Sequence, residues 1–191
     1  MAFDSLETPF GKAERIIGGS ATYIGLAASN FSNDVHLVSV VGDDFPQEQL
    51  EDLTRRGVSS EGVERKKGEK SFFWSGKYHN DMNTRDTLDT QLNVLEDFQP
   101  KVPDSASEVD FLMLGNLTPS VQMDVILQMK TRPKLILLDT MNFWMDVALD
   151  ELHEVLKEID VLTINDEEAR QLSGEFSLLK AARKILSMGP N

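Results

Sequence analysis

The chain has 191 residues, of which 40% are hydrophobic, so it can bury a core and fits one domain, or one domain with a small appendage. Its 19 basic and 32 acidic residues give a formal net charge of -13, which disfavours binding to a nucleic-acid backbone. Cysteine is absent, which excludes disulfides and thiolate metal sites. No signal-like leader is recognisable and the apolar runs are only strand-sized, so a soluble, cytoplasmic protein is expected.

The N-terminal part of the chain is expected to pass from irregular structure into alternating helix and strand. Residues 1–17 contain turn-forming residues, and only a short extended stretch is expected at their end. The elements expected next are a helix from Ser20, as its cap, to about Asn30, a strand over 36–41, and a helix over 45–56 closed by Gly57.

Residues 58–95 have a different character and predict a small antiparallel sheet, with a hairpin connection at 79–83. This segment is rich in aromatic side chains, too many for a free-standing hairpin, so one face should cover something. The covered feature is either the main core or a ligand. For any one of these aromatic side chains taken singly, packing against the core is the simpler interpretation. These aromatic residues are Phe72, Phe73, Trp74 and Tyr78.

The remainder of the chain alternates strands and helices. Such alternation predicts a mostly parallel sheet with helices on both faces. The expected strands are 109–114, 135–138 and 161–164, and the expected helices are 120–130, 150–158, 166–172 and 177–187.

Polar residues follow several of the expected strands. In an open parallel sheet, ligands gather beyond the carboxyl ends of the strands, so these residues are candidates for binding. Each also has a structural explanation, because Asp and Asn cap helices and form Asx turns. The candidates are Asp4, Gly42-Asp43-Asp44, Gly115-Asn116, Asp139-Thr140-Met141-Asn142 and Asn165-Asp166-Glu167-Glu168.

Several of these motifs together carry a family resemblance. The segment from Gly18 to Tyr23, the alanine-rich helix after it, Gly42-Asp43-Asp44 and Asn165-x-x-Glu168 resemble the signature regions of PfkB-type (ribokinase-like) carbohydrate kinases. The segment 58–95 resembles the sugar-covering β lid of that family. The resemblance covers nearly the whole chain. It implies an α/β ribokinase-like fold, with a mostly parallel sheet flanked by helices and a small β-rich lid, over an incomplete domain spanning 1–191.

The resemblance implies a sugar site at the start of the chain. Asp4 resembles the family aspartate that accepts hydrogen bonds from sugar hydroxyls, for which an acceptor-only carboxylate is well suited. Gly18 and Gly19 would allow the backbone to approach the sugar closely. Tyr23 departs from the family's usual asparagine, so we expect a changed substrate contact at this position.

The resemblance also implies a phosphate and magnesium site that serves ATP. Asn165 and Glu168 resemble the family residues that organise Mg²⁺ and its water shell, Glu168 acting indirectly through water. Asn142 resembles a further polar position near the phosphate path. A structural alternative for Asn165 and Glu168 is a helix capping box, worth about 1 kcal/mol of stability. Both roles are compatible.

Two departures from the family limit the expected activity. The family normally has a full apolar strand before the aspartate that Asp4 resembles. The family's Gly-Ala-Gly-Asp loop, which supplies the catalytic base and an anion-binding helix start, has no counterpart in residues 1–191. The expectation is a kinase cut at both ends, with its base beyond Asn191, little activity alone, and a possible homodimer through the lid or an exposed sheet edge.

Two other function classes compete with this expectation. The first is a catalytically inactive sugar-binding module or pseudo-kinase fragment, which would keep the sugar pocket without phosphoryl transfer. The second is a dinucleotide-binding oxidoreductase, which requires a Gly-x-Gly-x-x-Gly turn after a first strand. Gly18-Gly19 lacks that spacing and precedes the first clear strand, so the oxidoreductase is disfavoured.

Overall fold

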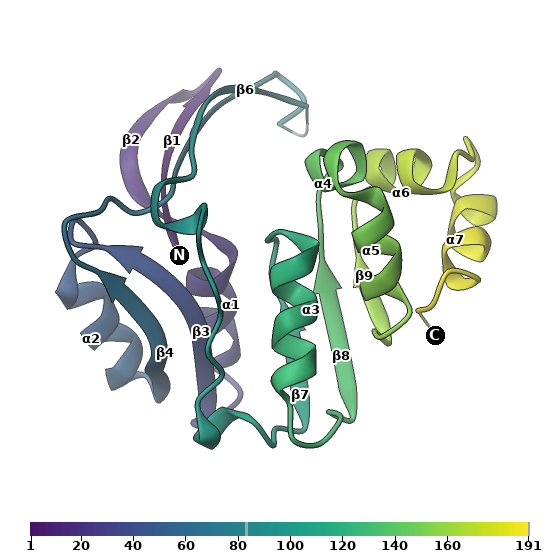
Figure 1. Ribbon diagram of the computed structural model, residues 1–191. Coiled ribbons are helices and arrows are strands. Elements are labelled where there is room, and N and C mark those ends of the chain that lie inside the picture. Colours follow the sequence, from purple (N-terminus) through teal and green to yellow (C-terminus); the bar gives the residue numbers. More distant parts are fainter. Residues whose placement is uncertain (83, 191) are drawn as a thin grey trace. The chain divides into compact units, whose positions relative to one another are not determined.

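The computed structural model describes residues 1–82 and 84–190 and divides into two compact units, Met1–Phe98 and Gln99–Asn191. In Figure 1 the first unit runs from purple to teal and the second from green to yellow. Asn83, part of the predicted hairpin connection, lies outside the described residues.

A four-stranded sheet in the first unit has the strand order β2-β1-β5-β6. Strand β1 pairs with β2 in an antiparallel manner and with β5 in a parallel manner, and β5 and β6 form an antiparallel hairpin. The prediction that residues 1–17 are mostly irregular is therefore wrong. Their weak local pattern is overridden by pairing with a distant strand, which a local reading of the sequence does not reveal. The strands are β1 Ala2–Thr8, β2 Gly11–Gly18, β5 Phe73–Tyr78 and β6 Arg85–Gln91.

The rest of the first unit contains a βαβ arrangement, together with one further helix and a short 3-10 helix. Strands β3 and β4 are parallel and are connected through helix α2. The prediction that placed residues 58–66 in the antiparallel sheet is wrong, because these residues form β4 and pair with β3. Periodicity identifies a strand but not its neighbour. The elements are α1 Ser20–Ala28, β3 Val35–Gly42, α2 Gln47–Arg55, β4 Val58–Lys66 and the short 3-10 helix Asn93–Leu95.

The sequence predicts the end of helix α2 correctly but not the cap at the start of helix α1. Helix α1 begins after Gly19, and no side chain caps it, so Ser20 is not the cap that the sequence predicts. Helix α2 ends just before Gly57, whose φ of +81° is the left-handed conformation expected of a glycine that closes a helix.

The second unit confirms the predicted alternation of strands and helices. Strands β7, β8 and β9 form a parallel sheet in sequence order. Helix α4 was not predicted, because its short sequence follows the strand end without a clear apolar period. The elements are the 3-10 helix Asp104–Ala106, β7 Phe111–Leu114, α3 Pro119–Gln128, β8 Leu135–Asp139, α4 Asn142–Val147, α5 Leu149–Leu156, β9 Val161–Thr163, α6 Asp166–Ser173 and α7 Leu178–Leu186.

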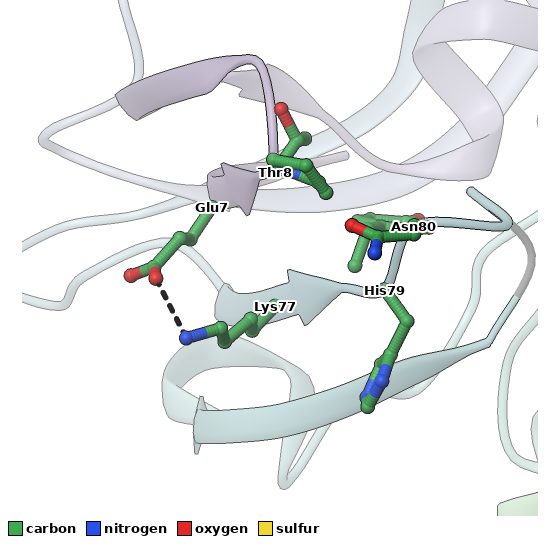
Figure 2. A pocket seen from close by; sticks show the side chains of 7 residues that line it. Glu7, Thr8, Lys77, His79 and Asn80 are labelled. Carbon is green, nitrogen blue, oxygen red and sulfur yellow. Dashed lines mark ion pairs between the residues drawn. The ribbon is translucent and has the colours of Figure 1, made fainter.

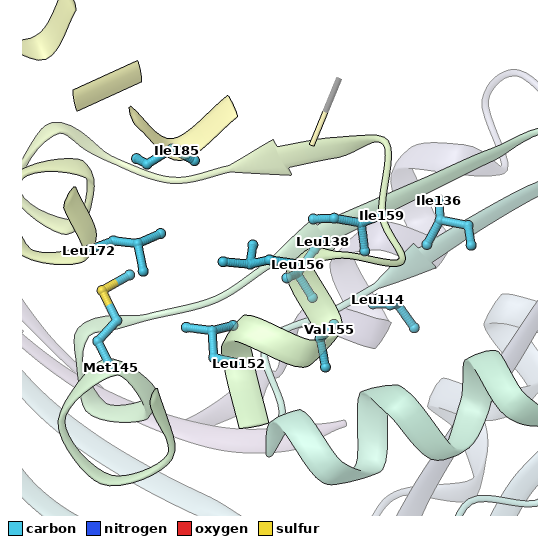
Figure 3. Close-up of a cluster of buried hydrophobic side chains, with 10 residues drawn as sticks. All are labelled: Leu114, Ile136, Leu138, Met145, Leu152, Val155, Leu156, Ile159, Leu172 and Ile185. Atoms are coloured by element: carbon cyan, nitrogen blue, oxygen red, sulfur yellow. The ribbon is translucent and has the colours of Figure 1, made fainter. Parts of the chain in front are cut away.

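Each unit has its own hydrophobic core. In the first unit, Phe3 of β1 packs against Phe45, with ring centroids 5.6 Å apart, and joins Val41 and Leu50. In the second unit, apolar side chains of β7 and β8 pack with those of helices α4, α5, α6 and α7 (Figure 3). This larger core contains Leu114, Ile136, Leu138, Met145, Leu152, Val155, Leu156, Ile159, Leu172 and Ile185. These cores hold the strands in place, and they thereby fix the positions of the residues that follow each strand.

Among the described residues, no helix combines the length and the apolar character needed to cross a membrane.

The larger core predicts a contrast between two leucine substitutions. Leu152 of α5 is fully buried, so Leu152→Ala should lower the free energy of unfolding of the second unit by about 2–5 kcal/mol. Leu179→Ala, on the exposed side of α7, should change it by less than about 0.5 kcal/mol. Urea denaturation followed by circular dichroism measures both. Equal effects would contradict this assignment of the core.

Candidate functional site

The carboxylate of Asp4 lies directly against the glycine pair in the first unit. A Cβ atom on Gly18 would stand only 2.0 Å from Oδ2 of Asp4, so no larger residue fits while Asp4 keeps this position. The backbone N–H of Gly19 donates a hydrogen bond to the Asp4 carboxylate. Gly19 has a φ of +84°, and a Cβ there would approach the backbone nitrogen of Ala2 to 2.8 Å. The glycines thus allow the turn between β2 and α1 to pack against β1.

Burial raises the pKa of Asp4, and the hydrogen bond from the Gly19 N–H partly offsets this effect. The carboxylate is half-buried and has acceptor capacity beyond that single bond. An incompletely satisfied, partly desolvated carboxylate is suited to accept hydrogen bonds from ligand hydroxyl groups. The structure therefore brings together Asp4, Gly18 and Gly19, three of the predicted sugar-site residues.

Tyr23 is placed differently. Its side chain is 56% exposed, and its phenol hydroxyl donates a hydrogen bond of 3.0 Å to the carbonyl oxygen of Ile17 at the end of β2. This contact explains the residue structurally. A substrate contact of Tyr23 stays a prediction.

Both carboxylates of Gly42-Asp43-Asp44 are used by contacts within the first unit. Asp43 accepts a hydrogen bond from the backbone N–H of Gly68, at 2.6 Å. Asp44 accepts from both the N–H and the hydroxyl of Ser71, at 2.7 and 2.8 Å, and pairs with Arg15 of β2 at 2.6 Å. Burial opposes these interactions, but together they lower the pKa of Asp44. These hydrogen bonds hold the segment between β4 and β5 against the end of β3.

In the second unit, Asn165 and Glu168 form a complete capping box at the start of α6. The Asn165 side chain accepts from the Glu168 N–H, and the Glu168 carboxylate accepts from the Asn165 N–H, both at 2.9 Å. Glu168 is only 5% exposed. The structural alternative for these residues is confirmed. The box uses one of the two carboxylate oxygens of Glu168 and one lone pair of the single amide oxygen of Asn165, so it does not use all of their acceptor capacity.

Asp139, at the end of β8, is an electrostatic neighbour of Glu168. Burial, followed by the charge of Glu168, raises the pKa of Asp139 to about 6, and hydrogen bonds from the backbone N–H groups of Asn116 and Thr140 act in the opposite direction. The ends of β7, β8 and β9 thus meet, as expected for parallel strands.

Two further buried polar groups lie at this edge. Gln122 of α3 donates to the carbonyl oxygens of Gly115 and Asp139, at 2.8 and 3.2 Å. The hydroxyl of Thr140 and the side-chain oxygen of Gln122 have no hydrogen-bond partner within residues 1–82 and 84–190. Buried polar groups are normally paired, so these two atoms indicate a place for water or ligand.

Asn142 begins α4 and is held by α6. Its amide donates to Gln171 at 2.6 Å, and Gln171 in turn donates to Asp146 at 2.7 Å. A role of Asn142 near a phosphate would use the other polar atoms of its amide, because one N–H donates to Gln171. That role stays a prediction.

Sequence reasoning missed the proximity of the Asp139 and Glu168 carboxylates and the burial of the Thr140 and Gln122 side chains. The positions of Asp139 and Thr140 at a strand end were visible in the sequence, but the partner across the sheet was not. Gln122 gave no signal, because one glutamine within a helix carries no pattern.

A separate hollow of about 360 Å³ lies at the tips of β1 and β5 and contains none of the predicted site residues. Figure 2 shows the ion pair between Glu7 and Lys77 at its wall, with a separation of 2.9 Å. Glu7 also pairs with Lys12 at 2.7 Å, and bonds to the two lysines lower the pKa of Glu7 to about 2. These charges satisfy one another. The lining residues are Glu7, Thr8, Pro9, Lys77, Tyr78, His79 and Asn80.

The raised pKa of Asp139 predicts a pH-dependent effect on stability. The folded state binds this proton more tightly than the unfolded state, so the stabilising contribution is present below the ordinary pKa of 3.8 and is lost as the pH rises through about 6. Asp139→Asn should therefore raise the melting temperature at about pH 8 and raise it less at about pH 4.

Thermal denaturation at the two pH values measures this effect. Asp124→Asn, on the exposed side of α3, is the matched control and should show no such pH dependence. A destabilising effect of Asp139→Asn at the higher pH would contradict the assigned burial and charge repulsion.

The protein has clear similarity to one family at the level of sequence. The family model described as "pfkB family carbohydrate kinase" matches residues 4–191. No curated protein matches the chain.

Solved structures show the same fold at low identity. A putative Ribokinase II from E. coli in its apo form has a TM-score of 0.68 and 18% identity, covering 99% of this chain and 68% of that chain. The Burkholderia thailandensis nucleoside kinase in complex with inosine has a TM-score of 0.70 and 16% identity, covering 96% and 64%. Halothermothrix orenii fructokinase has a TM-score of 0.70 and 16% identity, covering 98% and 73%.

The chain thus spans about two thirds of the length of these solved kinases. The structural likeness establishes a ribokinase-like fold with parallel sheets flanked by helices. The family match covers nearly all of the sequence. By this match, the chain belongs to the pfkB family of carbohydrate kinases.

Proposed function

We propose that this chain provides the substrate site and part of the magnesium and phosphate site of a kinase that transfers the γ-phosphoryl group of ATP to a hydroxyl of a sugar or related compound. The observation that carries the proposal is the half-buried Asp4 carboxylate held against Gly18 and Gly19. The family match and the fold shared with a fructokinase and a nucleoside kinase support it.

Asp4 would orient the substrate. A carboxylate accepts hydrogen bonds from two hydroxyl groups at once, and the bond from Gly19 fixes the direction in which it points. Because phosphoryl transfer depends largely on positioning, a fixed acceptor that holds the sugar in one orientation contributes directly to rate.

The second unit carries oxygen groups that fit an indirect role toward Mg²⁺. Asp139, Glu168 and the hydroxyl of Thr140 lie at the strand ends, and that hydroxyl has no hydrogen-bond partner in the part of the chain that the structure describes. Within the described part of the chain, no group of three or more His, Cys, Asp or Glu side chains could hold a metal ion. Mg²⁺ keeps several of its waters, so these oxygens would hold the hydrated ion rather than strip it. When bound, the ion would neutralise negative charge on the phosphates.

The proposed ATP dependence rests on the family and on one related structure. A putative Ribokinase II from E. coli in complex with ATP and Mg²⁺ has a TM-score of 0.66 and 15% identity, and the match covers 99% of this chain and 67% of that chain. In the proposal, Asn165 and Glu168 serve both as the cap of α6 and as neighbours of the hydrated ion. The cap keeps both side chains fixed, which limits the reorganisation needed when the ion binds.

The catalytic base is proposed to lie outside residues 1–191, because this sequence contains no Gly-Ala-Gly-Asp segment. The same observation favours a second candidate function, a sugar-binding module without catalysis. In either case the 191-residue polypeptide alone should give no ATP-dependent phosphorylation of ribose, fructose or inosine. Sustained turnover in a coupled ADP-release assay would place a base within these residues.

Binding tests the sugar site independently of turnover. Asp4→Asn keeps the size of the side chain and removes its charge, so it should weaken binding by about tenfold to a hundredfold, as expected for lost charge-assisted hydrogen bonds. Titration calorimetry with ribose, fructose and inosine measures the affinity. Asp97→Asn, at an exposed position of the same unit, is the matched control. Unchanged affinity of Asp4→Asn would overturn the role of Asp4.

A further inference from the structure

The register between β1 and β2 shifts by one residue beside Asp4. Leu6 pairs with Ala13, whereas Asp4 pairs with Ile16, so β2 has two residues where β1 has one. Such a β-bulge interrupts the regular alternation of side chains, and bulges are frequent beside functional sites, where they redirect a side chain. The two residues of β2 in this bulge are Glu14 and Arg15, and they stand opposite Ser5.

The bulge decides which side chain of β2 lies across from Asp4. If the ladder continued regularly from the pair of Leu6 and Ala13, Arg15 would be the register partner of Asp4 and would share its face of the sheet. A guanidinium in that place would pair with the carboxylate and compete with ligand hydroxyl groups for its oxygens. The bulge places the uncharged Ile16 there instead.

The side chain of Arg15 is held on the opposite face. Its Cζ lies 4.2 Å from the centroid of the Phe3 ring, a cation–π contact. Phe3 directly precedes Asp4, and successive side chains of a strand point to opposite faces. The guanidinium also pairs with Asp44, after the end of β3, at 2.6 Å. The positive charge of Arg15 is therefore used on the side of the sheet away from the Asp4 carboxylate.

The backbone of Arg15 is strained and is fixed by a contact of its own. Its φ of +48° lies in the left-handed region, which is uncommon for a residue with a Cβ atom. Its N–H donates a hydrogen bond of 2.9 Å to the hydroxyl of Ser5, the residue that follows Asp4. A strained conformation persists only where its surroundings hold it, and such residues cluster at functional sites. The backbone and side chain of Arg15 thus contact both sequence neighbours of Asp4.

We propose that Arg15 is a positioning residue for the sugar site: it holds the bulge, and the bulge keeps the Asp4 carboxylate available to hydroxyl groups beside the glycine turn. This inference rests on the proposed function and deepens it. Arg15 does not touch the substrate in this proposal. It acts through the two strands, because the ladder beyond the bulge leads directly to the pair of Ala2 and Gly18.

Two substitutions remove the anchor from opposite sides. Arg15→Met removes the guanidinium and keeps an unbranched side chain, and Asp44→Asn removes the charge but keeps an oxygen that can accept from Ser71. Each should weaken the binding of ribose or fructose to the 191-residue chain by about tenfold in titration calorimetry. The double variant should bind no more weakly than either single variant, because both changes remove the same ion pair.

Two further variants serve as rescue and control. Arg15→Lys keeps the positive charge opposite Asp44 and should bind sugar within about threefold of the wild type. Lys12→Met removes a charge from the same strand, where Glu7 keeps its second partner Lys77, and should leave the affinity unchanged. Far-UV circular dichroism checks that each variant folds, and the two single variants keep the test decisive if one does not.

Hydrogen exchange of single amides, followed by NMR, distinguishes positioning from general stability. The Gly19 N–H donates to the Asp4 carboxylate, so in Arg15→Met it should exchange about tenfold faster than in the wild type. The amide of Leu53, inside α2 of the same unit, should exchange at its wild-type rate.

The outcomes separate this inference from the proposed function. If Asp4→Asn weakens sugar binding but Arg15→Met and Asp44→Asn bind as the wild type does, the positioning role is wrong and the sugar site stands. If the Gly19 and Leu53 amides exchange faster by the same factor, Arg15 stabilises the unit as a whole and the positioning role is also wrong. If the wild type binds no sugar, the proposed function fails, and the role of Arg15 fails with it.

Discussion

The close approach of the Gly18 backbone to the Asp4 carboxylate is the constraint on which the proposed sugar site depends. Since a Cβ at Gly18 would stand 2.0 Å from an Asp4 oxygen, the carboxylate can occupy its position only beside glycine. Gly19 then turns the backbone so that its N–H donates to the same carboxylate. The antiparallel pairing of β1 with β2, in which Ala2 is the register partner of Gly18, holds this turn beside β1. The Asp4 carboxylate is thus held in one orientation by the glycine turn and by the register of its strand.

The second unit shows how one set of contacts can serve both stability and a site. The capping box of Asn165 and Glu168 satisfies backbone groups at the start of α6, and it holds the Glu168 carboxylate close enough to Asp139 for their charges to interact. That repulsion costs stability at neutral pH, because both groups are partly desolvated. A nearby cation would offset this cost, which gives a physical reason for placing a hydrated Mg²⁺ at this edge of the sheet.

The predictability of each feature depends on whether its cause is local. The strand at β8, the helix at α6 and its capping box follow from apolar runs and capping residues, and they were readable from the sequence. The hairpin of β1 and β2, and the pairing of β4 with β3, depend on distant partners and were missed. Among the candidate site residues, a motif pointed to Asp4 and the glycines, whereas the proximity of Asp139 to Glu168 depends on the meeting of two strand ends, which no local pattern reveals.

The backbone amide of Gly19 reports most directly on the central claim, because it donates to the Asp4 carboxylate. Titration of the ¹⁵N-labelled chain with fructose or ribose, followed by NMR, locates the bound sugar. If Asp4 is the sugar acceptor, the Gly19 resonance should shift saturably with added sugar, and the shift should vanish in Asp4→Asn. Saturable shifts elsewhere in the chain, with the Gly19 resonance unmoved, would contradict the account.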